Sequence, residues 1–127
     1  MSFSPVALFA FNRPYHTLQT LNSLSENPEV NQTDLYAFID GARKTSEIQL
    51  VDNVEKIIRS FESKFKSLTV YRSEVNLSGA INQKRGITKV LSENEFVISI
   101  EDDIYVSNHF LAYMNSALKI YKNSKEV

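Results

Sequence analysis

The stretch "FVISIEDDIYV", residues 96–106, joins a run of apolar, β-branched residues to three consecutive acids. A short continuous apolar run of this kind is typical of a β-strand that is covered on both faces. The acids are Glu101, Asp102 and Asp103, and three adjacent carboxylates repel one another. The sequence therefore predicts a buried strand whose end meets a metal ion, a basic side chain or only water.

Strand-like and helix-like stretches alternate along the rest of the chain. We expect strands over residues 5–11, 34–40, 68–73 and 96–100, and helices over residues 14–25, 46–66, 76–91 and 107–122. The second helix repeats its apolar residues at spacings of three and four: Val51, Val54, Ile58, Phe61 and Phe65. This order predicts the α/β class, with a mostly parallel sheet, right-handed crossovers and helices on both faces.

Polar residues gather where the predicted strands end. Asn12 and Arg13 follow the first strand, Asp40 ends the second, and the acids at 101–103 end the fourth. In parallel sheets, ligands bind beyond the carboxyl ends of the strands, near the point where the strand order reverses. We therefore expect these side chains to line one rim of the sheet.

The acids have two interpretations. Mg²⁺ and Mn²⁺ prefer carboxylate oxygens and keep coordination positions open for phosphates, so the cluster can hold a metal ion against a diphosphate. The alternative is a solvated turn, because acidic side chains are also favoured near the N-terminus of a helix.

Other polar residues have two interpretations as well. Arg13, at a helix start, can contact a phosphate together with free backbone N–H groups, or it can pair with an acid across the rim. Asp40 can accept hydrogen bonds from a ribose or base, or it can be an ordinary turn residue before Gly41. Lys84 or Arg85 can reach a diphosphate or lie on a solvated helix face.

Composition narrows the class of protein. The 127 residues suit one domain, and 43% of them are hydrophobic, which is enough for a core. A net charge of −1 argues against nucleic-acid binding and a membrane-surface role, and the absence of cysteine excludes disulfides and thiolate metal sites. No apolar run approaches the ~20 residues of a membrane span. The start of the chain lacks the pattern of a signal peptide, so we expect a cytoplasmic protein.

Several common phosphate-binding and catalytic motifs are missing. The chain has three glycines, and none forms a G-x-G-x-x-G, a Walker A loop or a G-x-S-x-G elbow. This counts against dinucleotide oxidoreductases, P-loop NTPases and α/β hydrolases. Phosphate binding here would have to use a metal ion together with Arg or Lys side chains.

Four segments together carry a family resemblance: "ALFAFNRPYHTLQTLNSL" (7–24), "FIDGAR" (38–43), "GAINQKRGITKVL" (79–91) and "VISIEDDIYVSNHFLAYM" (97–114). In this order they resemble the nucleotide-sugar-binding half of GT-A glycosyltransferases, in the N-acetylglucosaminyltransferase I-like and family 2-like branch. The resemblance implies a Rossmann-like half of a GT-A fold, with three α/β/α layers and the strand order 3-2-1-4. It also implies a single nucleotide-sugar-binding domain over residues 1–127.

The resemblance implies roles for individual residues. Asp103 stands where the family has the acid that ligates Mn²⁺ (or Mg²⁺), within its D-x-D-type motif. Glu101 and Asp102 match positions near the ribose and the sugar or diphosphate. The other nucleotide-sugar-binding positions are Asp40 at the base, Arg13 near the phosphates with Asn12 beside it, and Arg85 or Lys84 on the third helix.

A complete GT-A enzyme continues past this motif with an acceptor site and, in inverting enzymes, a catalytic base. We therefore expect the donor half of a longer enzyme, which binds a UDP- or GDP-sugar but does not transfer sugar alone, with the base beyond Val127. Part of the sheet face is expected to be uncovered, which favours association of the chain with a second copy, as a homo-oligomer, or with another partner. The alternative is a non-catalytic α/β interaction module with an incidental acidic cluster.

Overall fold

The computed structural model describes residues 3–123, and within this range four strands form one sheet. The strands are β1 (Val6–Ala10), β2 (Asp34–Ile39), β3 (Ser67–Arg72) and β4 (Ile98–Glu101). They lie in the order β3-β2-β1-β4, and every neighbouring pair is parallel. The predicted α/β class and the predicted strand order 3-2-1-4 are confirmed.

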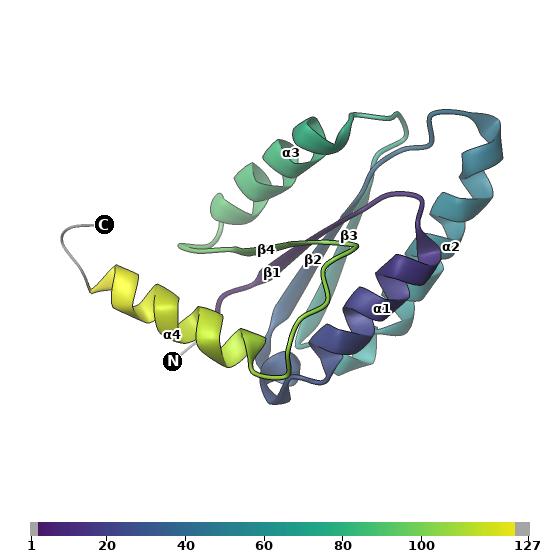
Figure 1. The fold of residues 1–127 in the computed structure, drawn as a ribbon. Coiled ribbons are helices and arrows are strands. Elements are labelled where there is room, and N and C mark those ends of the chain that lie inside the picture. Colours follow the sequence, from purple (N-terminus) through teal and green to yellow (C-terminus); the bar gives the residue numbers. More distant parts are fainter. Residues whose placement is uncertain (1–2, 124–127) are drawn as a thin grey trace.

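Helices cover the sheet on both faces (Figure 1). The helices are α1 (Pro14–Ser25), α2 (Ile48–Ser60), α3 (Gly79–Leu91) and α4 (Phe110–Lys122), with 3-10 turns η1 (Pro28–Gln32), η2 (Thr45–Glu47) and η3 (Glu62–Lys64). Helices α1 and α2 lie on one face of the sheet and α3 on the other (Figure 1). Right-handed crossovers produce this arrangement, because the chain moves one way from β1 to β3 and back across the sheet to reach β4.

The two faces of the sheet have separate cores, since successive side chains of a strand point to opposite faces. On β1, Val6 and Leu8 join the larger core with α1, α2 and α4, whereas Ala7 and Phe9 face α3. All five residues of β1 are buried, which explains why its sequence is a continuous apolar run and does not alternate.

Some boundaries differ from the prediction. Helix α2 ends at Ser60 and not near residue 66, although Phe61 and Phe65 are buried as their spacing predicts. The 3-10 turn η3 carries the chain between these two aromatic residues. Strand β4 extends to Glu101, and α4 begins only at Phe110, because the residues between them form two turns and an irregular segment.

Over residues 3–123, no helix combines the length and the apolar character that crossing a membrane requires.

Candidate functional site

A cavity of about 520 Å³ lies at the carboxyl ends of β1, β2 and β4. It coincides with the point where the strand order reverses, because β2 and β4 lie on opposite sides of β1. Polar side chains line it from the ends of all three strands, from the segment before α3 and from the first turns of α3: Asn12, Arg13, Asp40, Arg43, Asn76, Ser78, Asn82, Gln83, Glu101 and Asp102. Five of the seven predicted site residues are therefore brought together here, and Asp103 and Arg85 are not among the lining residues.

Arg13 provides the positive charge that the acids require. Its Nη2 lies 2.6 Å from Asp102 Oδ1 and 3.8 Å from Asp103 Oδ2. The side chain of Asp102 is 6% exposed, whereas those of Arg13 and Asp103 are close to half exposed. Arg13 therefore joins a buried carboxylate to one that solvent or a ligand can reach.

Two hydrogen bonds hold the backbone of Asp102, one to a backbone carbonyl and one from a threonine hydroxyl. Its N–H donates to Phe9 O at 3.1 Å, and its carbonyl accepts from Thr20 Oγ1 at 2.8 Å. Burial raises the pKa of the Asp102 carboxyl above its ordinary value, and the hydrogen bond from Arg13 opposes this rise. The same hydrogen bond raises the pKa of Arg13, so the guanidinium stays charged at the rim.

Glu101 occupies the last position of β4 and points toward α3. Its Oε1 accepts a hydrogen bond from Gln83 Nε2 at 2.6 Å, and its side chain is exposed. Gln83 lies in the first turns of α3, so this contact ties the start of that helix to the end of β4. No feature of the sequence distinguishes Gln83 from an ordinary exposed helix residue.

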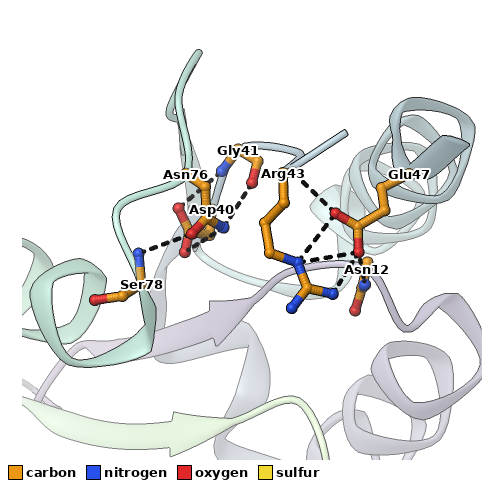
Figure 2. A network of polar contacts seen from close by, with 7 residues as sticks. All are labelled: Asn12, Asp40, Gly41, Arg43, Glu47, Asn76 and Ser78. Carbon is orange, nitrogen blue, oxygen red and sulfur yellow. Dashed lines mark hydrogen bonds and ion pairs between the residues drawn. The ribbon is translucent and has the colours of Figure 1, made fainter. Parts of the chain in front are cut away.

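Asp40 follows β2 directly and is almost fully buried, at 3% exposed. Its Oδ1 accepts from the backbone N–H groups of Gly41 at 2.8 Å and Leu77 at 2.7 Å. Its Oδ2 accepts from Asn76 Nδ2 at 3.3 Å (Figure 2). Asp40 therefore adopts the turn geometry that its position before Gly41 suggests, and it also contacts Asn76 and Leu77, which are 36 and 37 residues away.

A second polar network lies beside Asp40 (Figure 2). Glu47 Oε2 accepts from Arg43 Nη2 at 2.6 Å and from Asn12 Nδ2 at 2.8 Å, and its Oε1 accepts from Arg43 N at 2.8 Å. These hydrogen bonds from Arg43 lower the pKa of Glu47 to about 2. The Arg43 guanidinium also lies 5.3 Å from the centre of the Phe11 ring.

Sequence reasoning missed Arg43 and Glu47. Arg43 lies inside the segment "FIDGAR", but nothing in that segment shows that its partner is four residues further along. Glu47 reads as an ordinary acid at a helix start, and only its burial identifies it as part of the site. The one feature of the sequence that indicates this pair is an acid four residues after an arginine. Such spacings are common in sequences, so it does not identify the pair by itself.

Arg85, on α3, does not line this cavity, although it contacts Asn82, which does. Its Nη2 donates to Asn82 Oδ1 at 2.8 Å, and its guanidinium lies 5.8 Å from the centre of the Phe38 ring. It lines a different, largely apolar cavity of about 540 Å³, together with Tyr71 and Lys89 among others. The α3 residues that line the cavity at the strand ends are Gly79, Asn82 and Gln83, and Arg85 is not among them.

A divalent cation fits the rim only as an ion shared with a ligand. Asp103 offers a half-exposed carboxylate, and Mg²⁺ or Mn²⁺ is commonly held by one or two carboxylates together with substrate phosphates and water. Across residues 3–123, no group of three or more acidic or histidine side chains converges as a metal site. The side chains therefore suit a cation that arrives with phosphates, and they do not form a self-contained metal centre.

Comparison with known proteins identifies the fold. No protein-family profile matches the sequence, and no curated protein matches it. Among solved structures, the crystal structure of S. aureus TarS is similar, with a TM-score of 0.66 and 21% sequence identity. The similar region covers 96% of this chain and 20% of TarS, so the chain spans about a fifth of that protein's length. At this identity the likeness shows the fold alone, a Rossmann-like α/β half domain.

Proposed function

We propose that this chain is the donor-binding half of a metal-dependent glycosyltransferase and that it binds a UDP- or GDP-sugar. The observation that carries the proposal is the cavity at the reversal of strand order, where Asn12, Arg13, Asp40 and Asp102 converge from three strand ends. This is where parallel sheets bind their ligands, and the mixture of cation, acid and amide suits a polar, charged molecule.

The fold supports the same assignment. TarS is a glycosyltransferase, and the likeness between the two folds covers nearly all of this chain. The finer assignment to the N-acetylglucosaminyltransferase I-like branch rests on the sequence resemblance alone and stays a prediction. So do association into a homo-oligomer and a cytoplasmic location.

Different residues would contact different parts of the proposed ligand. Asp103 would hold Mn²⁺ or Mg²⁺ together with the donor phosphates, and this ion would neutralise the charge that develops on the leaving diphosphate. Arg13, charged and half exposed, would contact the same phosphates from the start of α1, just after β1. Asp102 keeps Arg13 in place, and Glu101 with Gln83 lies on the side where the ribose and sugar would pass.

Arg85 has no direct place in this arrangement. Its guanidinium is engaged by Asn82 and by the Phe38 ring, outside the residues that line the cavity. The arginine nearest in role is Arg43, which lines the cavity and whose Nη2 and Nε donate to Glu47. We propose donor binding for the chain, whereas sugar transfer requires an acceptor site and a base to which we assign no residue.

Thermal unfolding tests the proposal. A ligand present at 100 times its dissociation constant stabilises a protein by about 2.7 kcal/mol. We expect UDP or GDP to raise the melting temperature only when Mn²⁺ or Mg²⁺ is present, and Asp103→Ala to abolish that rise. Asp34→Ala, at the opposite end of β2, serves as the matched control and should leave the rise intact.

No metal-dependent rise with any of UDP, GDP, CDP and TDP would mean that the proposed function is wrong. That result would instead favour the non-catalytic interaction module, for which the acids are incidental.

A further inference from the structure

Arg85 differs from the other arginines of the chain in its surroundings. Arg13, Arg43, Arg59 and Arg72 each have a side-chain nitrogen 2.6 to 2.9 Å from an acidic oxygen. Among the residues that the structure describes, no acid forms an ion pair with Arg85. Arg85 is therefore a cation that lacks a counter-ion within residues 3–123.

The hydrogen bonding of the Arg85 guanidinium is incomplete as well. Its Nη2 donates to Asn82 Oδ1 at 2.8 Å, whereas its Nε is buried and has no hydrogen-bond partner in the described part of the chain. The residue as a whole is half-buried. Withdrawing a charged group from water costs free energy unless the group is paired. This position therefore points to an anion that the described residues do not supply.

The cavity that Arg85 lines is large enough for a small organic molecule. Its volume is about 540 Å³, and ligand pockets typically measure roughly 300–1,000 Å³. Phe38 and Tyr71 line it with aromatic rings that are nearly parallel, at an interplanar angle of 8° and a centroid distance of 5.1 Å. Ile81 adds a further apolar side chain from α3. These walls suit a flat, apolar body.

Positive charge surrounds the same cavity. Lys84 and Lys89 line it together with Arg85, and no acidic side chain is among the described residues that do so. Lys89 Nζ lies 5.9 Å from the centre of the Tyr71 ring, and Arg85 Cζ lies 5.8 Å from the centre of the Phe38 ring. Cations and aromatic surfaces are thus adjacent, and together they complement a molecule that combines an aromatic body with a negative group.

We propose that the cavity beside α3 is a second ligand site, that it binds a small aromatic carboxylate, and that Arg85 binds the carboxylate group of this ligand. The guanidinium donates through nitrogen atoms that do not contact Asn82. The aromatic body of the ligand packs against Tyr71 and Ile81, and the two lysines add positive charge. This site is separate from the donor cavity and does not depend on the proposed function.

Three matched probes test the proposal by calorimetry, without nucleotide or metal ion. They are 2-naphthoate, the neutral 2-naphthylmethanol, and acetate, which has the carboxylate but no aromatic body. The variants are Arg85→Gln and Lys89→Glu. The control is Lys56→Glu, because Lys56 is an exposed lysine of α2, which covers the opposite face of the sheet (Figure 1). The NMR signals of the Tyr71 and Lys89 amides locate the bound probe.

We expect wild type to bind 2-naphthoate about tenfold more tightly than 2-naphthylmethanol, as for one hydrogen bond to a charged group, and not to bind acetate measurably. Arg85→Gln should weaken 2-naphthoate about tenfold and leave 2-naphthylmethanol unchanged, so that the two probes bind equally. Lys89→Glu should weaken 2-naphthoate by about fivefold, because exposed charges contribute less. Lys56→Glu should match wild type, and 2-naphthoate should shift the Tyr71 and Lys89 amide signals.

Several results would overturn the proposal. The first is the absence of saturable 2-naphthoate binding to wild type, and the second is equal affinity of wild type for the charged and the neutral probe. An Arg85→Gln variant that weakens both probes equally would show that Arg85 only supports the fold. Because Lys89 is exposed, Lys89→Glu decides the question if Arg85→Gln does not fold, and unchanged 2-naphthoate affinity in Lys89→Glu contradicts the proposal.

The proposed function is tested apart from this site. UDP with Mn²⁺ should leave the affinity for 2-naphthoate unchanged, because the two ligands occupy different cavities. Displacement of 2-naphthoate by UDP would mean that the nucleotide enters the cavity beside α3, which contradicts a separate site. A chain that binds 2-naphthoate as expected but shows no metal-dependent response to nucleotides would contradict the donor-binding assignment alone.

Discussion

Arg13 balances two carboxylates of different kinds with a single guanidinium. Asp102 is buried and holds Arg13 at 2.6 Å, while Asp103 is half exposed and lies 3.8 Å away. A buried acid paired in this way orients its partner more than it stabilises the fold, because desolvation offsets much of the attraction. The consequence is an arginine fixed at the cavity next to a carboxylate that is free to take a cation.

Glu47 is likewise a buried acid paired with an arginine, Arg43. This pairing makes the stability of the fold depend on acidic pH. A carboxyl whose folded pKa is depressed contributes stability above its unfolded pKa and loses it as the pH falls through the folded value. For Glu47 this window runs from 4.5 down to about 2. We expect Glu47→Gln to lower the melting temperature at pH 7 and to flatten its fall over this window.

The matched control is Glu26→Gln, because Glu26 is exposed and lies at the end of α1. It should follow the wild-type curve of melting temperature against pH. A Glu47→Gln variant that loses stability between pH 4.5 and 2 as steeply as wild type would contradict the assigned role of the Arg43–Glu47 contact.

Ser78 stores strain that a glycine would release. Its φ of 72° costs roughly 1–3 kcal/mol in a residue with a side chain, and glycine gives back about 0.5–1 kcal/mol through its greater freedom when unfolded. We expect Ser78→Gly to stabilise the fold by about 1 kcal/mol, or about 4 °C in melting temperature. Ser78→Ala keeps the strain and should show no such gain.

At the scale of elements, α3 owes its position to one glycine. Three aromatic rings from β1, β2 and β3 stack beneath this helix, with Phe38 between Phe9 and Tyr71 at centroid distances of 5.5 and 5.1 Å. A Cβ on Gly86 would lie 2.5 Å from Phe9 Cε1 and 2.8 Å from Phe38 Cδ2. The helix can approach the rings this closely only because residue 86 has no side chain.

Gly86→Ala should therefore destabilise the fold although alanine favours helix. Forcing a methyl group into a packed core costs about 1–3 kcal/mol, against about 1 kcal/mol gained in helix propensity. We expect a net loss of about 1 kcal/mol, measured by denaturant unfolding. Gly79→Ala is the control, since nothing lies within 4 Å of its Cβ position, and it should be neutral or stabilising. A Gly86→Ala variant as stable as wild type would show that the rings yield freely.

Element types and their order could be predicted from the sequence, because each strand and helix carries its own periodicity. The residues at which helices and strands end were harder to predict, because packing decides them and the periodicity of the sequence does not. Phe61 and Phe65 continue the apolar spacing of α2, and both are buried, yet the helix ends at Ser60. A 3-10 turn places these two rings in the core equally well, so their burial does not specify an α-helix.

At the scale of the whole molecule, parallel strands brought distant polar residues to one rim, as their positions at strand ends predicted. Contacts between side chains at that rim were not predictable. Asp40 and Asn76 are 36 residues apart, and only the folded chain shows that one holds the other. Arg85 was predicted at this rim but does not line the cavity there. Its position on α3 places it at a different cavity.

Two further cavities offer alternative places for a ligand in the part of the chain that the structure describes. One, of about 450 Å³, lies at the amino ends of β1 and β4, where Phe3, Phe96 and Asn115 line it. The second is the apolar cavity beside α3 that Arg85 lines. Because all three cavities have similar volumes, size does not select among them, and the charged residues at the carboxyl ends of the strands do.

A crystal structure of the chain with UDP or GDP and Mn²⁺ tests this choice most directly. The account predicts a diphosphate between the ends of β1 and β4, next to Arg13, with Mn²⁺ bound by Asp103 and by the phosphates. A nucleotide in either of the other two cavities, or one bound at the strand ends with no metal at Asp103, would contradict it.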